Sequence, residues 1–452
     1  MKKTQIQLSD HFTYQKLLRF VLPSIVMMVF TSIYGVVDGL FVSNFAGKTP
    51  FAAINLVMPF IMVLGGIGFM IGTGGTALVS KVLGEGEPEK AKRYFTMMIL
   101  FTLLVGAVLT VFGVTMMEKV ARFFGATDEM LHDCVLYGRI VISFTAAFML
   151  QNVFQSFLIA AEKPKLGLIA TVAAGVTNMA LDALFIAGFH WGVAGAAIAT
   201  SLSQLICAAF VIRSLMRRQD EARLMPAKLR PTPALVKRML LFGLPAGLQS
   251  VLYNVTNLYV QKAVNLMGTD TVAAWSIYAK IDGVFWPISN AFGIAIMTFV
   301  GQNYGARSRA RIQESIRTGW LLHLGMAVFF SAVAVLSSPL TMRLFSSDPA
   351  VLAEARQFIL HISSCYVLFS SVEVLSSAMR GVGNAVKPAV ITFFAVCVLR
   401  MALLFTVTFP HLSVLTISIC YPVTWAASSV LFILYYKFGR WMPRYPESAK
   451  SE

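Results

Sequence analysis

The chain has 452 residues, of which 57% are hydrophobic and only 13% are charged. A soluble domain carries about 25% charged residues, so this composition argues against a water-soluble protein. The net charge of +16 does not indicate nucleic-acid binding, because the Lys and Arg residues lie in short gaps between apolar blocks. We therefore expect a lipid bilayer around the chain and no nucleic-acid partner.

Apolar blocks follow one another along the chain, and each is about as long as the roughly 20 residues that cross a bilayer core. Pro and Gly inside several blocks are typical of membrane helices. The first block is too long for a signal-peptide core, so we expect it to remain as the first helix. The twelve predicted spans are residues 16–45, 52–80, 94–116, 136–160, 166–188, 193–214, 238–264, 273–299, 318–340, 358–379, 388–410 and 413–436.

Basic residues predict the orientation of these spans. An even number of spans places both termini on one side, and the gaps on that side hold most of the 37 Lys and Arg residues. The gaps on the other side hold isolated cations such as Lys119 and Arg343. The positive-inside rule then predicts a multi-pass membrane protein with both termini in the cytoplasm.

The chain also repeats itself. Phe20-Val-Leu-Pro23 recurs as Phe242-Gly-Leu-Pro245, and three further pairs of short segments keep nearly the same offset, about 222 residues. Six helices per repeat give both halves one orientation, so the fold class is all-α, with two six-helix lobes related by a pseudo-two-fold axis along the membrane normal. The predicted parts are an N-terminal lobe (1–215), a cytoplasmic linker (216–237), a C-terminal lobe (238–437) and a cytoplasmic tail (438–452). Two lobes around a cavity are what alternating-access transport needs.

Few acids fall inside the predicted spans. A carboxylate within the bilayer costs several kcal/mol unless it is paired, hydrated or protonated, so Asp38 and Asp182 are functional candidates. Asn178 lies one helical turn before Asp182 on the same face, and Thr200 is in the next predicted helix. These oxygens suit a sodium ion, or a proton shared by the two acids. The alternatives are that water hydrates Asp38 near a helix end and that the four residues form a structural polar network.

Other polar residues inside the spans could line a wet cavity or could form hydrogen bonds between helices. They are Tyr137, Gln151, Asn152 and Gln155 in the first half and Gln249, Tyr253, Asn254, Asn257 and Asn290 in the second. Glu373 is the acid of the second half and a candidate cavity residue, and Arg400 could neutralise it. Near a helix end, Asp282 and Lys280 could be hydrated or could pair with each other. We expect these charged groups to form structural pairs rather than a second coupling site.

Motifs for enzyme chemistry are absent from the sequence. The five cysteines include no CxxC pair, and the six histidines are scattered, so we expect no disulfide, metal cluster or catalytic cofactor. Transport is therefore a better hypothesis than a membrane-embedded enzyme. We expect no cofactor, and H+ or Na+ as the coupling ion.

Pro23 and Asp38 in the first helix, Asn178-x-x-x-Asp182 in the fifth, Thr200 in the sixth and the segment 300–306 together resemble the MATE (multidrug and toxic compound extrusion) family, in its bacterial multidrug-efflux branch. The resemblance covers nearly the whole chain. It implies two lobes around a V-shaped cavity and the export of cationic, amphipathic drugs in exchange for protons or sodium. It also implies a cation site at Asp38, Asn178, Asp182 and Thr200, cavity positions at Tyr34 and Gln155, and a bend at Pro23.

One departure from the family concerns the second lobe. A related branch carries a Glu in the seventh helix, where this chain has Tyr253-Asn254, so a sodium site of that kind is not expected here. The alternative function is a flippase for lipids or lipid-linked oligosaccharides from the same superfamily. Its anionic substrate would need a basic cavity, whereas the buried charges of the first lobe are acidic. We expect the protein to work as a monomer.

Overall fold

The computed structural model describes residues 14–161, 163–217 and 233–443, and its packing divides them into two units. Of the described residues, the N-unit comprises those within Arg19–Leu83 and Glu87–Gly247. The C-unit comprises residues 14–18, Gly84–Gly86 and the described residues from Leu248 onward. The described residues are almost entirely helical and contain no strand. The predicted linker at 216–237 lies mostly outside them, so the lobe boundaries remain a prediction.

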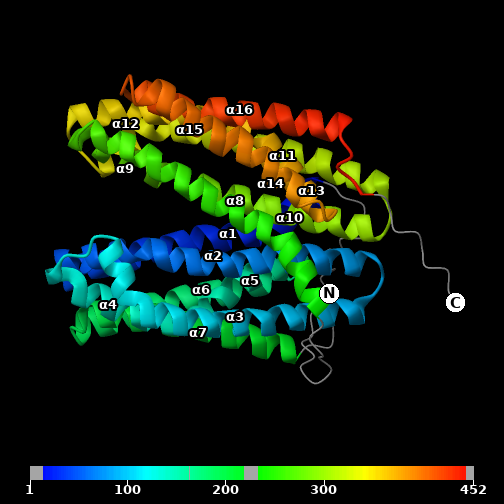
Figure 1. The fold of residues 1–452 in the computed structure, drawn as a ribbon, viewed down its shortest axis with the longest axis horizontal. Helices are drawn as coiled ribbons and strands as arrows, with labels where there is room; N and C mark the ends of the chain where they lie inside the picture. Colours follow the sequence, from blue (N-terminus) through cyan, green and yellow to red (C-terminus); the bar gives the residue numbers. More distant parts are fainter. Residues whose placement is uncertain (1–13, 162, 218–232, 444–452) are drawn as a thin grey trace. The chain divides into compact units, whose positions relative to one another are not determined.

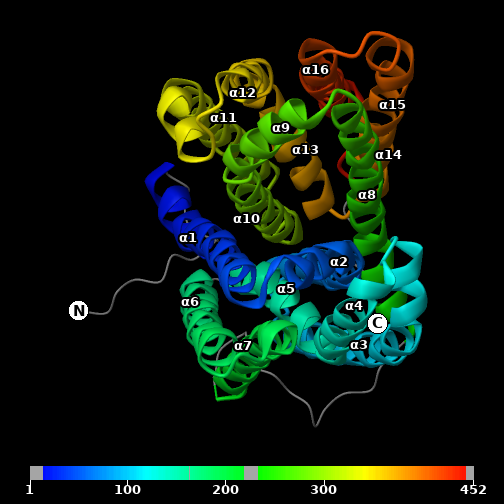
Figure 2. The same cartoon turned by 90° about the vertical axis from the view of Figure 1, so that its left-hand side faces the viewer.

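The N-unit is a bundle of long helices that run along one another (Figure 1). Within it, α3 packs against α4 and α5, and α6 packs against α5 and α7 (Figure 2). Its helices are α1 (Tyr14–Phe41), α2 (Lys48–Gly84), α3 (Pro88–Phe123), α4 (Asp128–Ser143), α5 (Thr145–Ala160), α6 (Pro164–Asp182) and α7 (Gly192–Met216). Short π-helical turns, Val42–Ala46 and Ala183–Gly188, extend α1 and α6.

The predicted span at 136–160 is broken, because the chain bends by 57° between α4 and α5. The break falls at Phe144, and it leaves the carbonyl oxygen of Ile142 available to side chains. The hydroxyl groups of Thr110 and Thr145 donate to this oxygen at 3.0 and 2.7 Å. Such hydroxyl donors satisfy backbone groups that a broken membrane helix leaves free.

The C-unit also consists of helices, several of which are interrupted. They are α8 (Pro233–Leu266), α9 (Thr269–Asp282), α10 (Phe285–Gly305), α11 (Arg309–Thr341), α12 (Pro349–Ile362), α13 (Ser370–Gly381), α14 (Val386–Thr392), α15 (Leu399–Leu403) and α16 (Val414–Phe438). The first half of α8 belongs to the N-unit. The predicted spans at 273–299 and 358–379 each contain a short break, but both remain single stretches long enough to cross a membrane.

The lengths of these helices agree with membrane crossing. Ten helical stretches of the described chain are long and apolar enough to span a bilayer, and the bent pair α4–α5 raises this number to eleven. The remaining long helix is α8, whose 34 residues would extend about 50 Å at 1.5 Å per residue. This length exceeds the roughly 30 Å of a bilayer core, so the helices accommodate the predicted twelve spans.

Glycines in α2 allow α5 to pack closely against it. A Cβ atom on Gly68 would lie 2.6 Å from the Cα atom of Met149, whereas a Cβ atom on Gly66 would meet nothing within 4 Å. We therefore expect Gly68→Ala to destabilise the protein by about 1–3 kcal/mol through overpacking. Gly66→Ala should be neutral or stabilising by up to about 1 kcal/mol, because Ala favours helix over Gly. Thermal unfolding of both variants in detergent checks this, and equal transitions would contradict it.

Candidate functional site

Two carboxyl groups lie at the centre of the N-unit site. Asp182 is the last residue of α6 and is completely buried, and Asp38 lies in the last turn of α1. The two carboxyl groups are within hydrogen-bonding reach of each other. In the described part of the chain, no donor reaches Oδ1 of Asp38 or either carboxylate oxygen of Asp182. Two such acids are stable together in apolar surroundings only if a proton or a cation neutralises their charge.

Three helices bring the predicted cation-site residues together. Asn178 is 1% exposed, and its Nδ2 donates to Oγ1 of Thr200 at 3.5 Å, which joins α6 to α7. Asn178 lies one helical turn before Asp182, so its contact with Thr200 is made on the side of α6 that also carries Asp182. Tyr137 of α4 is 1% exposed and interacts electrostatically with both acids. The sequence placed Tyr137 only among cavity residues and gave no signal of its position beside the carboxyl pair.

A glycine explains how α1 comes close enough to α6. A Cβ atom on Gly175 would lie 2.8 Å from Cδ1 of Tyr34, so the Tyr34 ring packs directly on the α6 backbone. Tyr34 lies one turn before Asp38, and Gly175 lies two turns before Asp182. This contact at Gly175 therefore aligns the two helices so that their carboxyl groups face each other.

The predicted cavity residues of α5 differ in their contacts. Gln151 is 4% exposed, and its side chain is within hydrogen-bonding reach of the Tyr34 hydroxyl group. Gln155, one turn further along, is partly exposed. α1 continues as a helix through Pro23, so the predicted bend at this residue remains a prediction.

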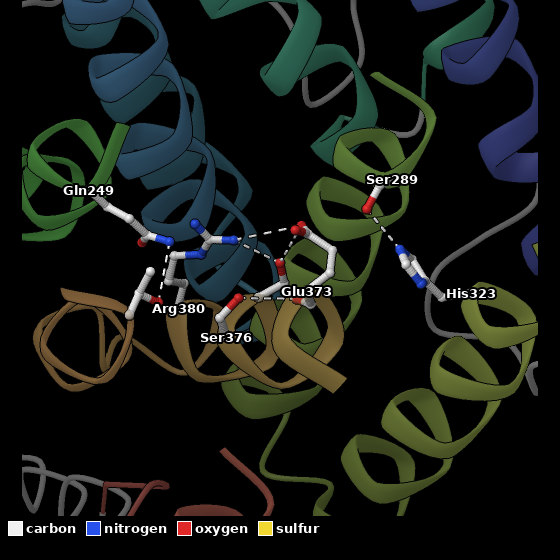
Figure 3. A network of polar contacts seen from close by, with 8 residues as sticks. Gln249, Ser289, His323, Glu373, Ser376 and Arg380 are labelled. Carbon is white, nitrogen blue, oxygen red and sulfur yellow. Dashed lines mark hydrogen bonds and ion pairs between the residues drawn. The ribbon is translucent and has the colours of Figure 1, made fainter. Parts of the chain in front are cut away.

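The polar residues of the C-unit form a different arrangement from the predicted one. Glu373 pairs with Arg380 (Oε1 to Nη2, 3.9 Å), and Ser377 lies between them. Ser377 donates to Glu373 at 3.3 Å and accepts from Arg380 at 2.8 Å, and Figure 3 shows the carboxylate and the guanidinium facing each other. The prediction that Arg400 neutralises Glu373 is therefore wrong.

Arg400 instead makes polar contacts with residues of other helices. Its Nη2 donates to Thr424 at 3.0 Å and its Nη1 to Asn257 at 3.5 Å, and its guanidinium group lies 4.2 Å from the ring centroid of Tyr421. Asn254, one turn before Asn257 on the α8 sequence, lies exposed. Among the polar residues of α8, Asn257 therefore contacts another helix, whereas Asn254 is exposed.

The predicted pairing of Asp282 with Lys280 is also wrong. Asp282 accepts from Nε1 of Trp286 at 2.6 Å and from the hydroxyl group of Tyr366 at 2.7 Å. The ammonium group of Lys280 lies 6.0 Å from the ring centroid of Phe345. Asp282 thus ties α9 to Trp286 of α10 and to Tyr366.

A buried histidine also connects helices of the C-unit. His323 of α11 is completely buried and lies 2.8 Å from Oγ of Ser289 (Figure 3). It also lies 3.0 Å from Oγ of Ser370. The described residues contain no group of three or more His, Cys, Asp or Glu that could hold a metal ion. A cation at Asp38 and Asp182 would therefore have to use neutral oxygens such as those of Asn178 and Thr200.

These features define a polytopic membrane protein built from a repeated helical unit, with a buried pair of acids in its first half. The MatE family model matches the chain twice, over residues 23–184 and 245–406, and the two matches cover more than half of it. They begin at Pro23 and Pro245, the two prolines of the repeat found in the sequence. The chain belongs to the MatE family of membrane transporters.

Sequence matches to two relatives of known name cover most of the chain. It is 25% identical over 430 residues to the probable multidrug resistance protein YoeA of Bacillus subtilis, covering 93% of this chain and 92% of YoeA. It is 25% identical over 371 residues to the multidrug export protein MepA of Staphylococcus haemolyticus, covering 81% of this chain and 80% of MepA.

A solved structure shares the fold. It is an outward-facing multidrug resistance MATE family transporter of the MOP superfamily, with a TM-score of 0.89, 20% sequence identity, and coverage of 97% of this chain and 98% of that one. This likeness confirms the predicted fold class of twelve membrane helices in two lobes.

Proposed function

We propose that this protein exports cationic, amphipathic drugs across the bacterial plasma membrane in exchange for protons or sodium ions. The observation that carries the proposal is the pair Asp38–Asp182, in which Oδ1 of Asp38 and both carboxylate oxygens of Asp182 lack donors within the described residues. The names of YoeA and MepA support multidrug export as the cargo class. The acidic character of the pair supports an inorganic cation as the coupling ion.

In the proposed mechanism, the acid pair alternates between a neutralised form and a charged form. A proton or sodium ion neutralises the pair, and its release leaves a buried charge that favours another arrangement of α1 and α6. A ligand shifts a conformational balance only by its different affinities for the two states, so the ion and the drug must favour different states. In this mechanism, Asn178 and Thr200 supply the neutral polar groups of the site. Tyr137 supplies a hydroxyl group that interacts electrostatically with both acids.

Transport of a fluorescent organic cation in proteoliposomes tests this function. With a pH gradient and a sodium gradient imposed separately, we expect at least one of them to drive the dye across the membrane, whereas protein-free vesicles should show no gradient-driven uptake. The gradient that works identifies the coupling ion. Translocation of a labelled lipid without dye flux under either gradient would contradict the proposal and would favour a lipid flippase.

A further inference from the structure

A pocket of about 240 Å³ lies within the C-unit, apart from the residues assigned to ion coupling. It is formed by α11, α13 and α16, and α13 packs against both other helices (Figure 2). Its lining includes Gln313, Arg317, Trp320, Leu375, Ile433 and Tyr436. The pocket therefore combines a cation, an amide, two aromatic rings and apolar side chains.

The polar lining of the pocket has a donor available for an anion. Arg317 is exposed and makes no ion pair within the described residues. Trp320 donates its Nε1 to Oγ of Ser371 at 3.0 Å, which fixes its ring at the pocket wall. Tyr436 interacts with Arg309, a second cation at the beginning of α11. The positive charge at this pocket therefore remains available to a ligand.

The apolar lining forms the other part of the pocket. Ile316 and Leu375 are 4% and 5% exposed, whereas Ile433 is 37% exposed. A ligand with one anionic end and one hydrocarbon part would match both kinds of lining. An organic cation would instead meet Arg317, whose charge repels it, so the pocket does not suit the proposed export cargo.

The position of the pocket along its helices indicates its depth in the bilayer. Arg317 lies eight residues after the beginning of α11 at Arg309, which corresponds to about 12 Å along the helix. Tyr436 lies in the last turn of α16, which ends at Phe438. Trp and Tyr are enriched where hydrocarbon meets lipid headgroups, and Arg side chains extend towards the same level. The pocket therefore lies at the headgroup boundary, at the basic end of these helices.

We infer that this pocket binds an anionic phospholipid. Arg317 would bind the phosphate group, Gln313 would donate a hydrogen bond to it, and an acyl chain would lie along Leu375 and Ile433. Basic pockets between membrane helices on the cytoplasmic side are a recognised type of site for anionic headgroups. The positive-inside rule predicts that this basic end faces the cytoplasmic leaflet, where anionic lipids are present.

Binding of phosphatidylglycerol to the delipidated full-length protein in detergent tests the inference. Native mass spectrometry can count bound lipids, and thermal unfolding can measure their stabilising effect. We expect Arg317→Gln to weaken the apparent affinity for phosphatidylglycerol about fivefold, the loss expected for one basic residue near a membrane surface, about 1 kcal/mol. Arg317→Lys should keep most of the affinity, because it keeps the charge.

Arg213→Gln is the matched control, because Arg213 is an exposed arginine in the last turn of α7 that lines no part of this pocket. It should bind phosphatidylglycerol as the unaltered protein does. Three results would overturn the inference: equal weakening in Arg317→Gln and Arg213→Gln, equal affinity for phosphatidylcholine, or equal stabilisation by inorganic phosphate alone. The last result would indicate a site for free anions.

Discussion

The substitution Asp182→Asn is expected to abolish ion-driven export while the protein remains folded in the membrane. The amide is nearly isosteric with the carboxyl group, so the completely buried position can accept it. It cannot take up or release a proton, and it removes one of the two negative charges that would attract a sodium ion. A loss of several kcal/mol of ion binding corresponds to a fall in gradient-driven transport of at least about a hundredfold.

Proteoliposome transport of a fluorescent cation measures this effect, with protein content matched between preparations. Glu129→Gln is the control, because Glu129 is an exposed acid in the first turn of α4 in the same unit. We expect this variant to transport at the unaltered rate. Full gradient-driven export by Asp182→Asn at equal protein content would remove the carboxyl pair from the coupling mechanism.

The helices and their order followed from the sequence because burial in lipid imposes simple requirements. Each span must be long, apolar and internally hydrogen-bonded, and these properties are local. The break at Phe144 was not predictable in the same way. Thr145 of the segment itself donates to the Ile142 carbonyl at the break, but so does Thr110, a residue of another helix. No local pattern in the segment 136–160 predicts the donor Thr110.

The N-unit site was largely predictable because two kinds of information coincided. The four-residue spacing of Asn178 and Asp182 placed both on one helical face. The resemblance to the MATE family then indicated that Asp38 and Thr200, from other helices, belong to the same site. The close approach of α1 and α6 depends on Gly175, a single residue whose role becomes clear only when the ring of Tyr34 packs on it.

The partner of Glu373 was predicted wrongly although the sequence held a signal for it. Ser377 and Arg380 follow Glu373 by four and seven residues, so all three lie on one face of α13. This spacing favours Arg380 over Arg400, which lies in a different helix. The partners of Arg400 come from α8 and α16, and only the packed structure brings those helices to it.

Breaking the Glu373–Arg380 pair should have the largest effect on stability. Glu373 and Arg380 have side chains that are only 16% and 20% exposed, and the Glu373 carboxylate packs against Gly293 of α10. In Arg380→Met the carboxylate loses its countercharge and keeps only the hydrogen bond from Ser377. Removing one partner of a buried pair costs about 3–5 kcal/mol, and the residual exposure here favours about 3 kcal/mol.

The double variant Glu373→Gln with Arg380→Met separates this effect from lost packing. Removal of both charges leaves no uncompensated ion, so we expect the double variant to recover most of the lost stability in thermal unfolding. Arg356→Met, at an exposed arginine of α12, should unfold as the unaltered protein does. If the double variant were as unstable as Arg380→Met alone, the methylene packing of Arg380 would be the stabilising contribution. Full recovery would instead show that Arg380 contributes mainly by neutralising the only acid of α13.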